Sequence, residues 1–439
     1  MHAPDEDNHR PGGRVQGSRL QYQSQAAPSM IPASIRNLAV CGLLLSSLLG
    51  WPLSAEKGNV SLEVSTTAPI TPFFAAVKSQ PAQVHLRPEN DSPEVGLMRT
   101  GATITVTACR PDCAAPHAWA LLAPEGAIKL ELLNTKPVHL ETPTSPTAET
   151  SWYGRVGKSG IKVFREPRLN GPIVTHERLS REMAFLPNSD LRNGGWLERV
   201  EGGFVRASRV KTLTPSRFQG QVRPDLPLAF LVRDVPTSGD RQSVGLHRYD
   251  RIAVRKIDGR RVVTDSGSLP RSAVRIVTRH SPPSSIPTGA KWVIVDLAQQ
   301  TLTAYEGESA VYATLISSGK DYKESETHVG LYQVEHKMDY SDMHGESDEP
   351  YDVDRVPYAL YFHKNEALHG TYWHDRFGAP ASHGCVNLSL ADARWLFKWS
   401  PPHLPENWST IDPKAAGLPS LWVLIKKTTG PRAISFREP

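Results

Sequence analysis

The chain has 439 residues and a mass of 48.4 kDa, which is too long for one ordinary domain and enough for two or three. Hydrophobic residues make up 39% and charged residues 22%, so the composition supports a packed core and excludes a wholly disordered chain. The net charge of +5 is too weakly basic to argue for nucleic acid as a partner. The 37 prolines, about 8% of the chain against a usual ~5%, indicate linkers between small modules.

Residues 1–55 predict an N-terminal extension followed by a signal peptide. Arg36 supplies a charged flank, residues 38–50 form an apolar run, and residues 53–55 (LSA) read as a small-residue cleavage site. The run is shorter than the ~20 residues of a membrane span, although a single N-terminal anchor is the alternative. We therefore expect a mature protein that is exported to the periplasm or cell wall and has no stable membrane span.

The cysteines outside that segment fall into a close pair and a single residue. Cys109 and Cys113 are four positions apart, and an oxidising compartment would join them in a disulfide. A C-x3-C pair alone is a poor zinc site, because no second pair completes four ligands. Cys385 is left unpaired, and an unpaired thiol in an exported chain points to chemistry.

The chain before residue 288 predicts small β modules joined by linkers. Short alternating strands appear at Gln83–Leu86, Thr103–Ala108 and Ala118–Leu122, between turns rich in Pro and Gly. This rhythm, together with Gly101, Trp119 and Gly126, resembles a bacterial SH3-like module, and a diverged copy follows it. The expected order is a flexible linker at 56–80, an SH3-like module at 81–135, a Pro/Thr linker at 136–150, a second small β module at 151–215 and a basic β-rich spacer at 216–280.

A basic stretch lies at the end of these modules. Residues 206–279 contain sixteen Lys and Arg against six Asp, a net charge of +10. One interpretation is contact with an anionic cell-wall polymer. The other is the solvated outer face of a spacer domain, because sheets routinely place charge on their exposed side. Both remain open from the sequence.

From Thr288 onward the strand pattern becomes sharper. Strands are predicted at Trp292–Leu297, Leu302–Tyr305 and Val311–Ile316. Residues 337–355 carry seven acidic side chains, and we expect them to form a loop crossing the surface. The spacing of their carboxylates does not match an EF-hand, so no calcium site is expected. Further on, Ser389 and Asp392 form a capping box that predicts a helix over Leu390–Trp399, ending before Pro401-Pro402.

Immediately before that helix lies a group of residues suited to nucleophilic catalysis. His369-Gly370 is followed by the run SHGCVNL at 382–388. A free thiol is mostly protonated at neutral pH, and a neighbouring histidine can take its proton to give a thiolate–imidazolium pair. Gly384 leaves room for a substrate backbone, and peptide N–H groups around Gly384 and Cys385 would hold a developing oxyanion.

A metal site is the competing interpretation of the same residues. Zinc would draw on the nearby imidazoles and the thiol of His363, His369, His374, His383 and Cys385. The segment lacks both a C-x-x-C and an H-E-x-x-H template, which favours a nucleophile over a metal ligand. No metal is therefore expected.

At these residues the sequence resembles the L,D-transpeptidase family, whose catalytic module is the YkuD domain. The resemblance rests on His369-Gly370, the run SHGCVNL and the lead-in WVIVDLAQQTLTAYEG at 292–307, and covers about residues 288–428. Residues 327–330 (THVG) are similar to the family's T-P-x-G segment. The departure is His328, where the family usually carries proline.

The resemblance implies a mainly β, multi-domain protein whose catalytic domain has a short helix after the nucleophile. Cys385 would attack the bond between residue 3 and terminal D-alanine of a tetrapeptide stem, and a neighbouring stem's amine would resolve the thioester into a 3→3 cross-link. His369 would be the general base and His383 would support the loop. The cleft and oxyanion site would be shaped by Ser382, Gly384, Asn387 and Gly370. No cofactor is implied, and carbapenems would acylate the same cysteine.

Several alternatives stay open. Water as acceptor would make an L,D-carboxypeptidase, and a protein amine would make an enzyme that anchors proteins to peptidoglycan. A non-catalytic wall-binding protein is a further alternative, although the intact His369, His383 and Cys385 argue against it. A papain-like endopeptidase fits poorly, because its histidine would follow the cysteine.

Overall fold

The computed structural model describes most of the chain after residue 70. The predicted signal peptide and most residues of both predicted linkers lie outside the described part. Within that part, no helix is long and apolar enough to cross a membrane. The described residues are 71–428, except for 79, 123–125, 136–147, 149, 158–159, 178–180, 188–194, 237–244, 321–324 and 346–349, together with the backbone of 434–435.

The first module is a small all-β unit, as the strand rhythm predicts. Alternating residues of its strands, including Val84, Ile104 and Val106, form one apolar core. Its SH3-like identity stays a prediction. The elements are β1 (Phe73–Val77), β2 (Ala82–His85), β3 (Glu94–Met98), β4 (Thr103–Arg110), β5 (Trp119–Leu122), β6 (Ala127–Lys129), the 3-10 turn η1 (Leu130–Leu132) and β7 (Leu133–Asn134).

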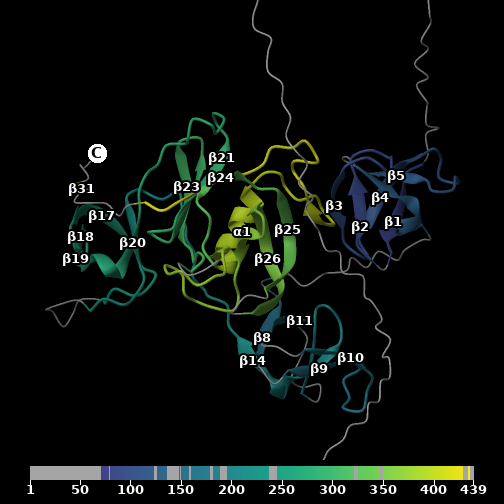
Figure 1. Cartoon of the computed structure of the whole chain (residues 1–439), viewed down its shortest axis with the longest axis horizontal. Helices are drawn as coiled ribbons and strands as arrows, with labels where there is room; N and C mark the ends of the chain where they lie inside the picture. Colours follow the sequence, from purple (N-terminus) through teal and green to yellow (C-terminus); the bar gives the residue numbers. More distant parts are fainter. Residues whose placement is uncertain are drawn as a thin grey trace, which may run out of the picture. The chain divides into compact units, whose positions relative to one another are not determined.

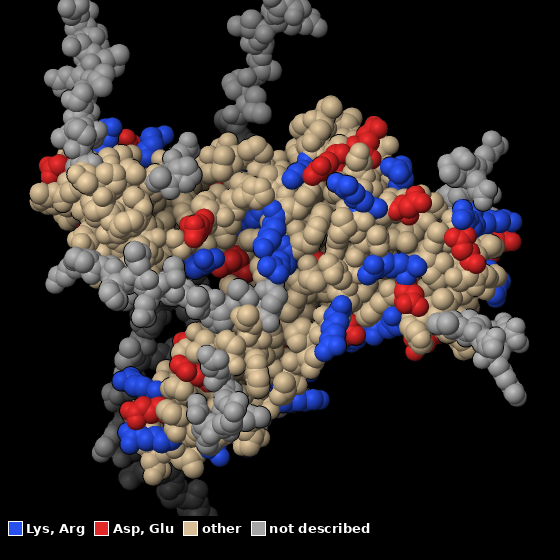
Figure 2. Space-filling view, turned by 180° about the vertical axis from the view of Figure 1, so that it is seen from behind, with Lys and Arg blue, Asp and Glu red and all other residues tan. Residues whose placement is uncertain are grey.

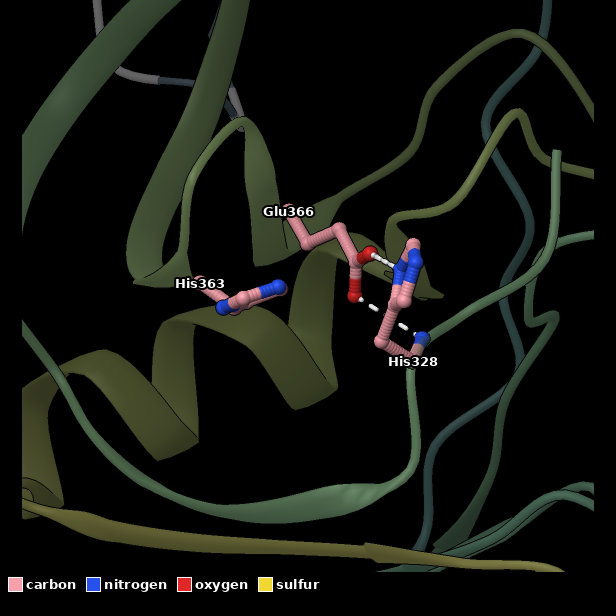
Figure 3. Close-up of side chains that lie close together, drawn as sticks. All are labelled: His328, His363 and Glu366. Atoms are coloured by element: carbon pink, nitrogen blue, oxygen red, sulfur yellow. Dashed lines mark hydrogen bonds and ion pairs between the residues drawn. The ribbon is translucent and has the colours of Figure 1, made fainter. Parts of the chain in front are cut away.

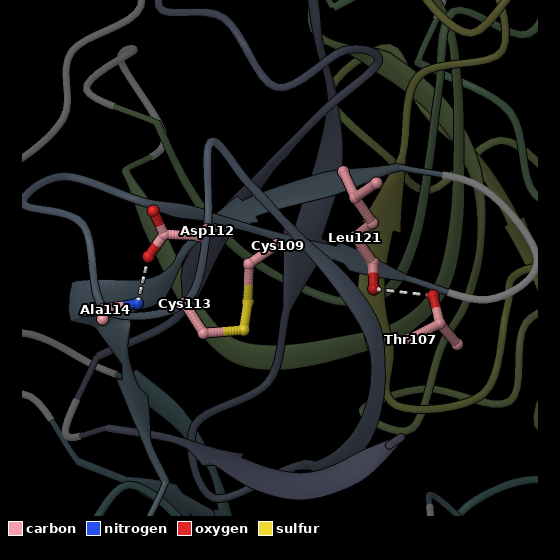
Figure 4. Close-up of a disulfide and its surroundings, with 6 residues drawn as sticks. All are labelled: Thr107, Cys109, Asp112, Cys113, Ala114 and Leu121. Atoms are coloured by element: carbon pink, nitrogen blue, oxygen red, sulfur yellow. Dashed lines mark hydrogen bonds between the residues drawn. A yellow bond between two sulfur atoms is a disulfide. The ribbon is translucent and has the colours of Figure 1, made fainter. Parts of the chain in front are cut away.

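The predicted disulfide is confirmed in this module (Figure 4). Cys109 at the end of β4 is bonded to Cys113 in the loop that follows. Inside the loop, the Asp112 carboxylate accepts a hydrogen bond from the Ala114 N–H at 2.8 Å. The bridge therefore ties a short loop to the end of a core strand.

Two more β units follow. The second contains β8 (Trp152–Val156), β9 (Ile161–Phe164), β10 (Ile173–Glu177), β11 (Arg181–Phe185), β12 (Trp196–Glu198), β13 (Phe204–Arg206), η2 (Ala207–Arg209) and β14 (Val210–Leu213). The third contains β15 (Gln221–Val222), β16 (Leu228–Leu231), β17 (Arg251–Asp258), β18 (Arg261–Thr264), β19 (Gly267–Pro270), η3 (Arg271–Ala273) and β20 (Val274–Val277), and β31 (Ile434–Ser435) pairs with β17. One of its strands, β15, pairs with β23 (Ser309–Leu315), a strand of the C-terminal domain.

Many cations of the basic stretch have partners within the protein. Arg255 pairs with Asp265, and Arg251 donates to the Gln219 carbonyl and the Gln221 amide oxygen. On the face of the molecule drawn in Figure 2, basic and acidic side chains lie interspersed. The binding of an anionic polymer by this stretch stays a prediction.

The remaining elements form the domain that carries the predicted nucleophile (Figure 1). One sheet has the order β15-β23-β22-β21-β30-β24, and β25 to β29 belong to a second sheet. The bounds are β21 (Lys291–Asp296), β22 (Thr301–Glu306), β23 (Ser309–Leu315), β24 (Gly330–Gln333), β25 (His336–Gly345), β26 (Tyr351–His363), β27 (Glu366–Gly370), β28 (Val386–Leu388), α1 (Leu390–Trp399), β29 (Trp408–Ile411) and β30 (Trp422–Lys426).

The core of this domain lies where the two sheets and the helix meet. Val293 and Val295 of one sheet, Leu368 and Val386 of the other, and Leu396 of α1 are buried in one cluster. The near-continuous apolar strand at 292–295 is what the sequence predicts for a strand covered on both faces. This packing holds β27 and β28 in place.

The expectation of a surface loop at residues 337–355 is wrong. Most of the segment lies in the long antiparallel hairpin β25–β26, which pairs His336 with Tyr361 and Ser341 with Val356. Its carboxylates have arginine partners from distant modules: Asp339 accepts from Arg99, at 2.6 and 3.0 Å. Sequence distance hides such pairs, so from the sequence the segment is too polar for a core strand and is interpreted as a loop.

The predicted helix α1 is confirmed with its N-cap. The Ser389 hydroxyl accepts a hydrogen bond from the Asp392 N–H at 3.1 Å, and the helix ends at Trp399 before the proline pair. Only Ser389 lies between the end of β28 and the first residue of the helix. The helix therefore fixes the C-terminal end of the strand that follows the nucleophile.

Candidate active site

Cys385 lies at the end of a tight turn that leads directly into β28. The Ser382 hydroxyl donates to the Cys385 carbonyl and accepts from the Gly384 N–H at 3.2 Å. Gly384 has a φ of +125°, a conformation that L side chains rarely adopt. A Cβ there would meet only ordinary contacts at 3.6 Å, so the backbone conformation, and not space, requires glycine.

A neighbouring loop holds this turn from outside. Thr327 donates its hydroxyl to the Gly384 carbonyl at 2.7 Å and accepts from the Gly319 N–H at 2.9 Å. Ser317 exchanges two backbone hydrogen bonds of 2.9 Å with Asn387. The turn that carries Cys385 and the strand after it are therefore held by the segments that follow β23 and precede β24.

The Cys385 thiol is partly exposed and lies against the β26–β27 turn. Its sulfur is 3.5 Å from the Asn365 carbonyl oxygen. The pKa of the Cys385 thiol is raised to about 11, mainly by burial; the backbone hydrogen bond from Ala367 acts to lower it, and the Glu366 charge acts to raise it. Before substrate binds, the thiol is therefore protonated.

His369 comes from β27, which runs parallel to β28. The register pairs Leu368 with Val386 and His369 with Asn387, so His369 lies two positions further along the paired strands than Cys385. Register partners in a parallel pair share a face of the sheet, which places the imidazole on the side that Asn387 occupies.

The His369 ring is buried and fixed. Its Nδ1 lies 3.0 Å from the Gly370 carbonyl oxygen, an arrangement in which Nδ1 carries the proton and Nε2 is free to accept one. Burial lowers the pKa of His369 to about 4, against the opposing effect of that carbonyl. The pKa values thus favour a neutral thiol and a neutral imidazole, and not the thiolate–imidazolium pair expected from the sequence.

The other predicted residues have different surroundings. His383 stacks on Tyr351 of β26, with ring centroids 4.7 Å apart. The Asn387 amide lies 2.9 Å from Nε2 of His374. Gly370 is a packing position, because a Cβ there would lie 3.0 Å from Pro357.

Three residues of this region were missed by the sequence reasoning. The Glu366 charge acts to raise the pKa of the Cys385 thiol. Burial is the main cause that raises the pKa values of Tyr351 and Tyr361, and the charge of Cys385 also acts to raise them. Both tyrosines lie on β26. The apolar and aromatic run at 356–362 (VPYALYF) was the signal for that strand, and the acidic residues before it obscured the signal.

A protein-family profile gives the class of the domain. Residues 290–412 match the YkuD family, described as the L,D-transpeptidase catalytic domain. A putative L,D-transpeptidase, YciB, of Bacillus subtilis (strain 168) is 29% identical over 121 residues, which are 26% of this chain. The match spans 62% of that relative's length, so the chain spans about three fifths of the curated relative that it matches.

Solved structures also give matches to part of the chain. An L,D-transpeptidase from Xylanimonas cellulosilytica DSM 15894 is 29% identical, covering 33% of this chain and 64% of that one with a TM-score of 0.23. The catalytic domain of an E. faecium L,D-transpeptidase is 22% identical, covering 32% of this chain and 98% of that one with a TM-score of 0.25.

The family profile agrees with the site. A turn that presents a thiol, followed by a strand and a capped helix, lies inside the matched residues. Residues 290–412 are therefore a YkuD-type L,D-transpeptidase catalytic domain, joined to further β units on its N-terminal side.

Proposed function

We propose that the chain is an exported peptidoglycan L,D-transpeptidase with Cys385 as nucleophile. The observation that carries the proposal is the partly exposed thiol at the end of the Gly384 turn, inside the residues that match the YkuD profile. The substrate is the stem peptide of peptidoglycan. Cys385 attacks the bond between residue 3 and the terminal D-alanine, so the stem up to residue 3 is the acyl donor.

In the first half-reaction His369 acts as general base. Its neutral imidazole accepts the thiol proton as sulfur attacks the donor carbonyl, because a thiol with a pKa of about 11 does not ionise in advance at neutral pH. The tetrahedral oxyanion then collapses, the C–N bond breaks, and the imidazolium gives its proton to the departing D-alanine amine. A thioester on Cys385 remains.

In the second half-reaction the same imidazole takes a proton from the incoming amine. The amine attacks the thioester carbonyl, the C–S bond breaks, and sulfur regains the proton. The product is a 3→3 cross-link, and both catalytic groups return to their starting forms. Ser382 and Gly384 shape the turn, and His383 stacked on Tyr351 lines its side.

The test is incubation of the protein with purified tetrapeptide muropeptides, with products measured by mass spectrometry. We expect a dimer formed with loss of one D-alanine, and no product from the Cys385→Ala variant. Tripeptide without dimer would show an L,D-carboxypeptidase, and transfer to an added protein amine would show an anchoring enzyme. Wall binding without any product would move the function to the N-terminal modules.

A further inference from the structure

His328, His363 and Glu366 form a three-residue cluster beside the nucleophile turn (Figure 3). One ring nitrogen from each histidine and one carboxylate oxygen all lie within 4.8 Å of one another. His328 precedes β24, while His363 ends β26 and Glu366 begins β27. Figure 3 shows the Glu366 carboxylate between the two imidazole rings.

The cluster is held in place before any ligand binds. The Glu366 side chain is only 10% exposed, whereas that of His328 is 59% exposed. The His328 backbone N–H donates to Glu366 at 3.2 Å, and its Nδ1 contacts the other carboxylate oxygen. The Tyr332 ring lies 4.8 Å from that of His363, and its hydroxyl donates to the Val329 carbonyl at 3.1 Å. A fixed carboxylate therefore faces an accessible imidazole.

An ion pair explains only two members of the cluster. His328 and Glu366 need no third residue to form an ion pair, and their side chains are in contact here. The ring of His363, 5.4 Å from that of His328 between centroids, brings a third donor atom to the same point. Convergence of three donors from separate strands is what a metal ion requires and an ion pair does not.

The donor set selects the kind of ion. Two imidazoles and one carboxylate suit Zn²⁺ and its first-row neighbours, whereas Mg²⁺ and Ca²⁺ prefer oxygen ligands alone. Three protein ligands would also leave a coordination position open for water or a substrate group.

We propose that His328, His363 and Glu366 bind one divalent transition-metal ion, for which Zn²⁺ is the probe. The site is separate from Cys385 but shares the β26–β27 turn, whose Asn365 carbonyl contacts the thiol sulfur. Binding does not depend on the proposed transpeptidase activity, and it is measured without turnover.

The experiment titrates Zn²⁺ into the full chain carrying Cys385→Ala, by isothermal calorimetry, so that the thiol cannot be a ligand. Co²⁺ is titrated in parallel, because its visible absorption reports the number and kind of ligands. We expect one ion per chain. His328→Pro, His363→Gln and Glu366→Gln should each weaken binding by about tenfold or more, since each removes a ligand.

His403→Gln is the matched control, because His403 is an exposed histidine outside the cluster. Its affinity should equal that of the parent, and circular dichroism of every variant checks the fold. His328→Pro introduces the proline that is usual at this position in the T-P-x-G segment of the L,D-transpeptidase family. Glu366→Gln keeps the size of the side chain. The proposal is overturned if Cys385→Ala binds no Zn²⁺, or if the three cluster variants bind as the control does.

Discussion

Two polar regions of the catalytic domain, one around helix α1 and one around Cys385, differ in how many hydrogen-bond partners their buried polar groups have. Asp392 in the first turn of α1 is buried and accepts from the Gly220 N–H at 2.8 Å and the Tyr312 hydroxyl at 2.6 Å. At the other end of α1, the buried Lys337 ammonium donates to the carbonyl oxygens of Phe397 and Ser400 at 2.6 and 2.8 Å. Each charge has fixed protein partners, as a structural role requires.

Around Cys385 the arrangement differs. Here the hydrogen-bond partners of the two side chains are backbone carbonyls, of Gly370 for the His369 ring and of Asn365 for the Cys385 thiol. The pKa shifts have the same cause in both regions: burial raises the pKa of Cys385 and lowers that of His369, just as it raises the pKa of Asp392 and lowers that of Lys337. Perturbed pKa values of this kind are common at functional sites. The comparison teaches that a pKa shifted by burial does not separate the two regions, whereas the number of hydrogen-bond partners does, because the Asp392 carboxylate accepts from Gly220, Tyr312 and Thr314.

The largest expected effect comes from Cys385→Ala. Turnover should fall by about 10⁴-fold or more, because loss of a nucleophile removes the covalent route. The melting temperature should stay close to that of the parent, since the sulfur forms only a weak contact with the Asn365 carbonyl. Substantial residual cross-linking in the muropeptide assay would exclude Cys385 as nucleophile.

His369→Ala should have the next largest effect. Removal of a general base typically costs about 10²- to 10⁴-fold, so acylation of Cys385 by a carbapenem should slow by that factor. The measurement is the rate of mass increase of the intact protein. Acylation at the parent rate would show that the base is misassigned and would make His383 the candidate.

Asp392→Ala tests the α1 side of the comparison. The substitution leaves the Gly220 N–H and the hydroxyls of Tyr312 and Thr314 buried without their acceptor, at about 1–3 kcal/mol each. We expect a loss of about 3 kcal/mol or more in stability, measured by denaturation monitored by tryptophan fluorescence. Asp392→Asn, which keeps one acceptor oxygen, should lose less; equal stability of all three proteins would contradict the role.

The smallest effect is the pH dependence of thiol alkylation in the free protein. Because the pKa of Cys385 is raised to about 11, its thiolate fraction should rise about tenfold per pH unit through neutral and mildly alkaline pH. Modification by iodoacetamide between pH 7 and pH 9 should therefore accelerate by about 100-fold without a plateau. A plateau near neutral pH would indicate a preformed thiolate–imidazolium pair.

Local patterns were the part of the fold that could be predicted. The cap at Ser389, the helix over Leu390–Trp399 and the disulfide between Cys109 and Cys113 depend on neighbouring residues, and all three are confirmed. The strands at 292–316 were found because apolar residues recur along each of them.

The hairpin β25–β26 and the role of Glu366 could not be predicted, for one physical reason. The carboxylates of Asp339 and Asp354 form ion pairs with Arg99 and Arg181, which lie in other modules. Pairs between residues so far apart in the sequence leave no local sequence pattern. Glu366 likewise affects Cys385 only because β27 and β28 are neighbours.

The sequence by itself determined the candidate nucleophile and its local setting: an unpaired thiol after glycine, a histidine upstream and a capped helix downstream. Tertiary structure decided what the ionisable groups do. It surrounded the thiol and the imidazole with protein and thereby favoured their neutral forms. It also brought His328, in the loop before β24, against Glu366, at the start of β27. A pKa and a ligand set depend on distances through space, which the order of residues does not contain.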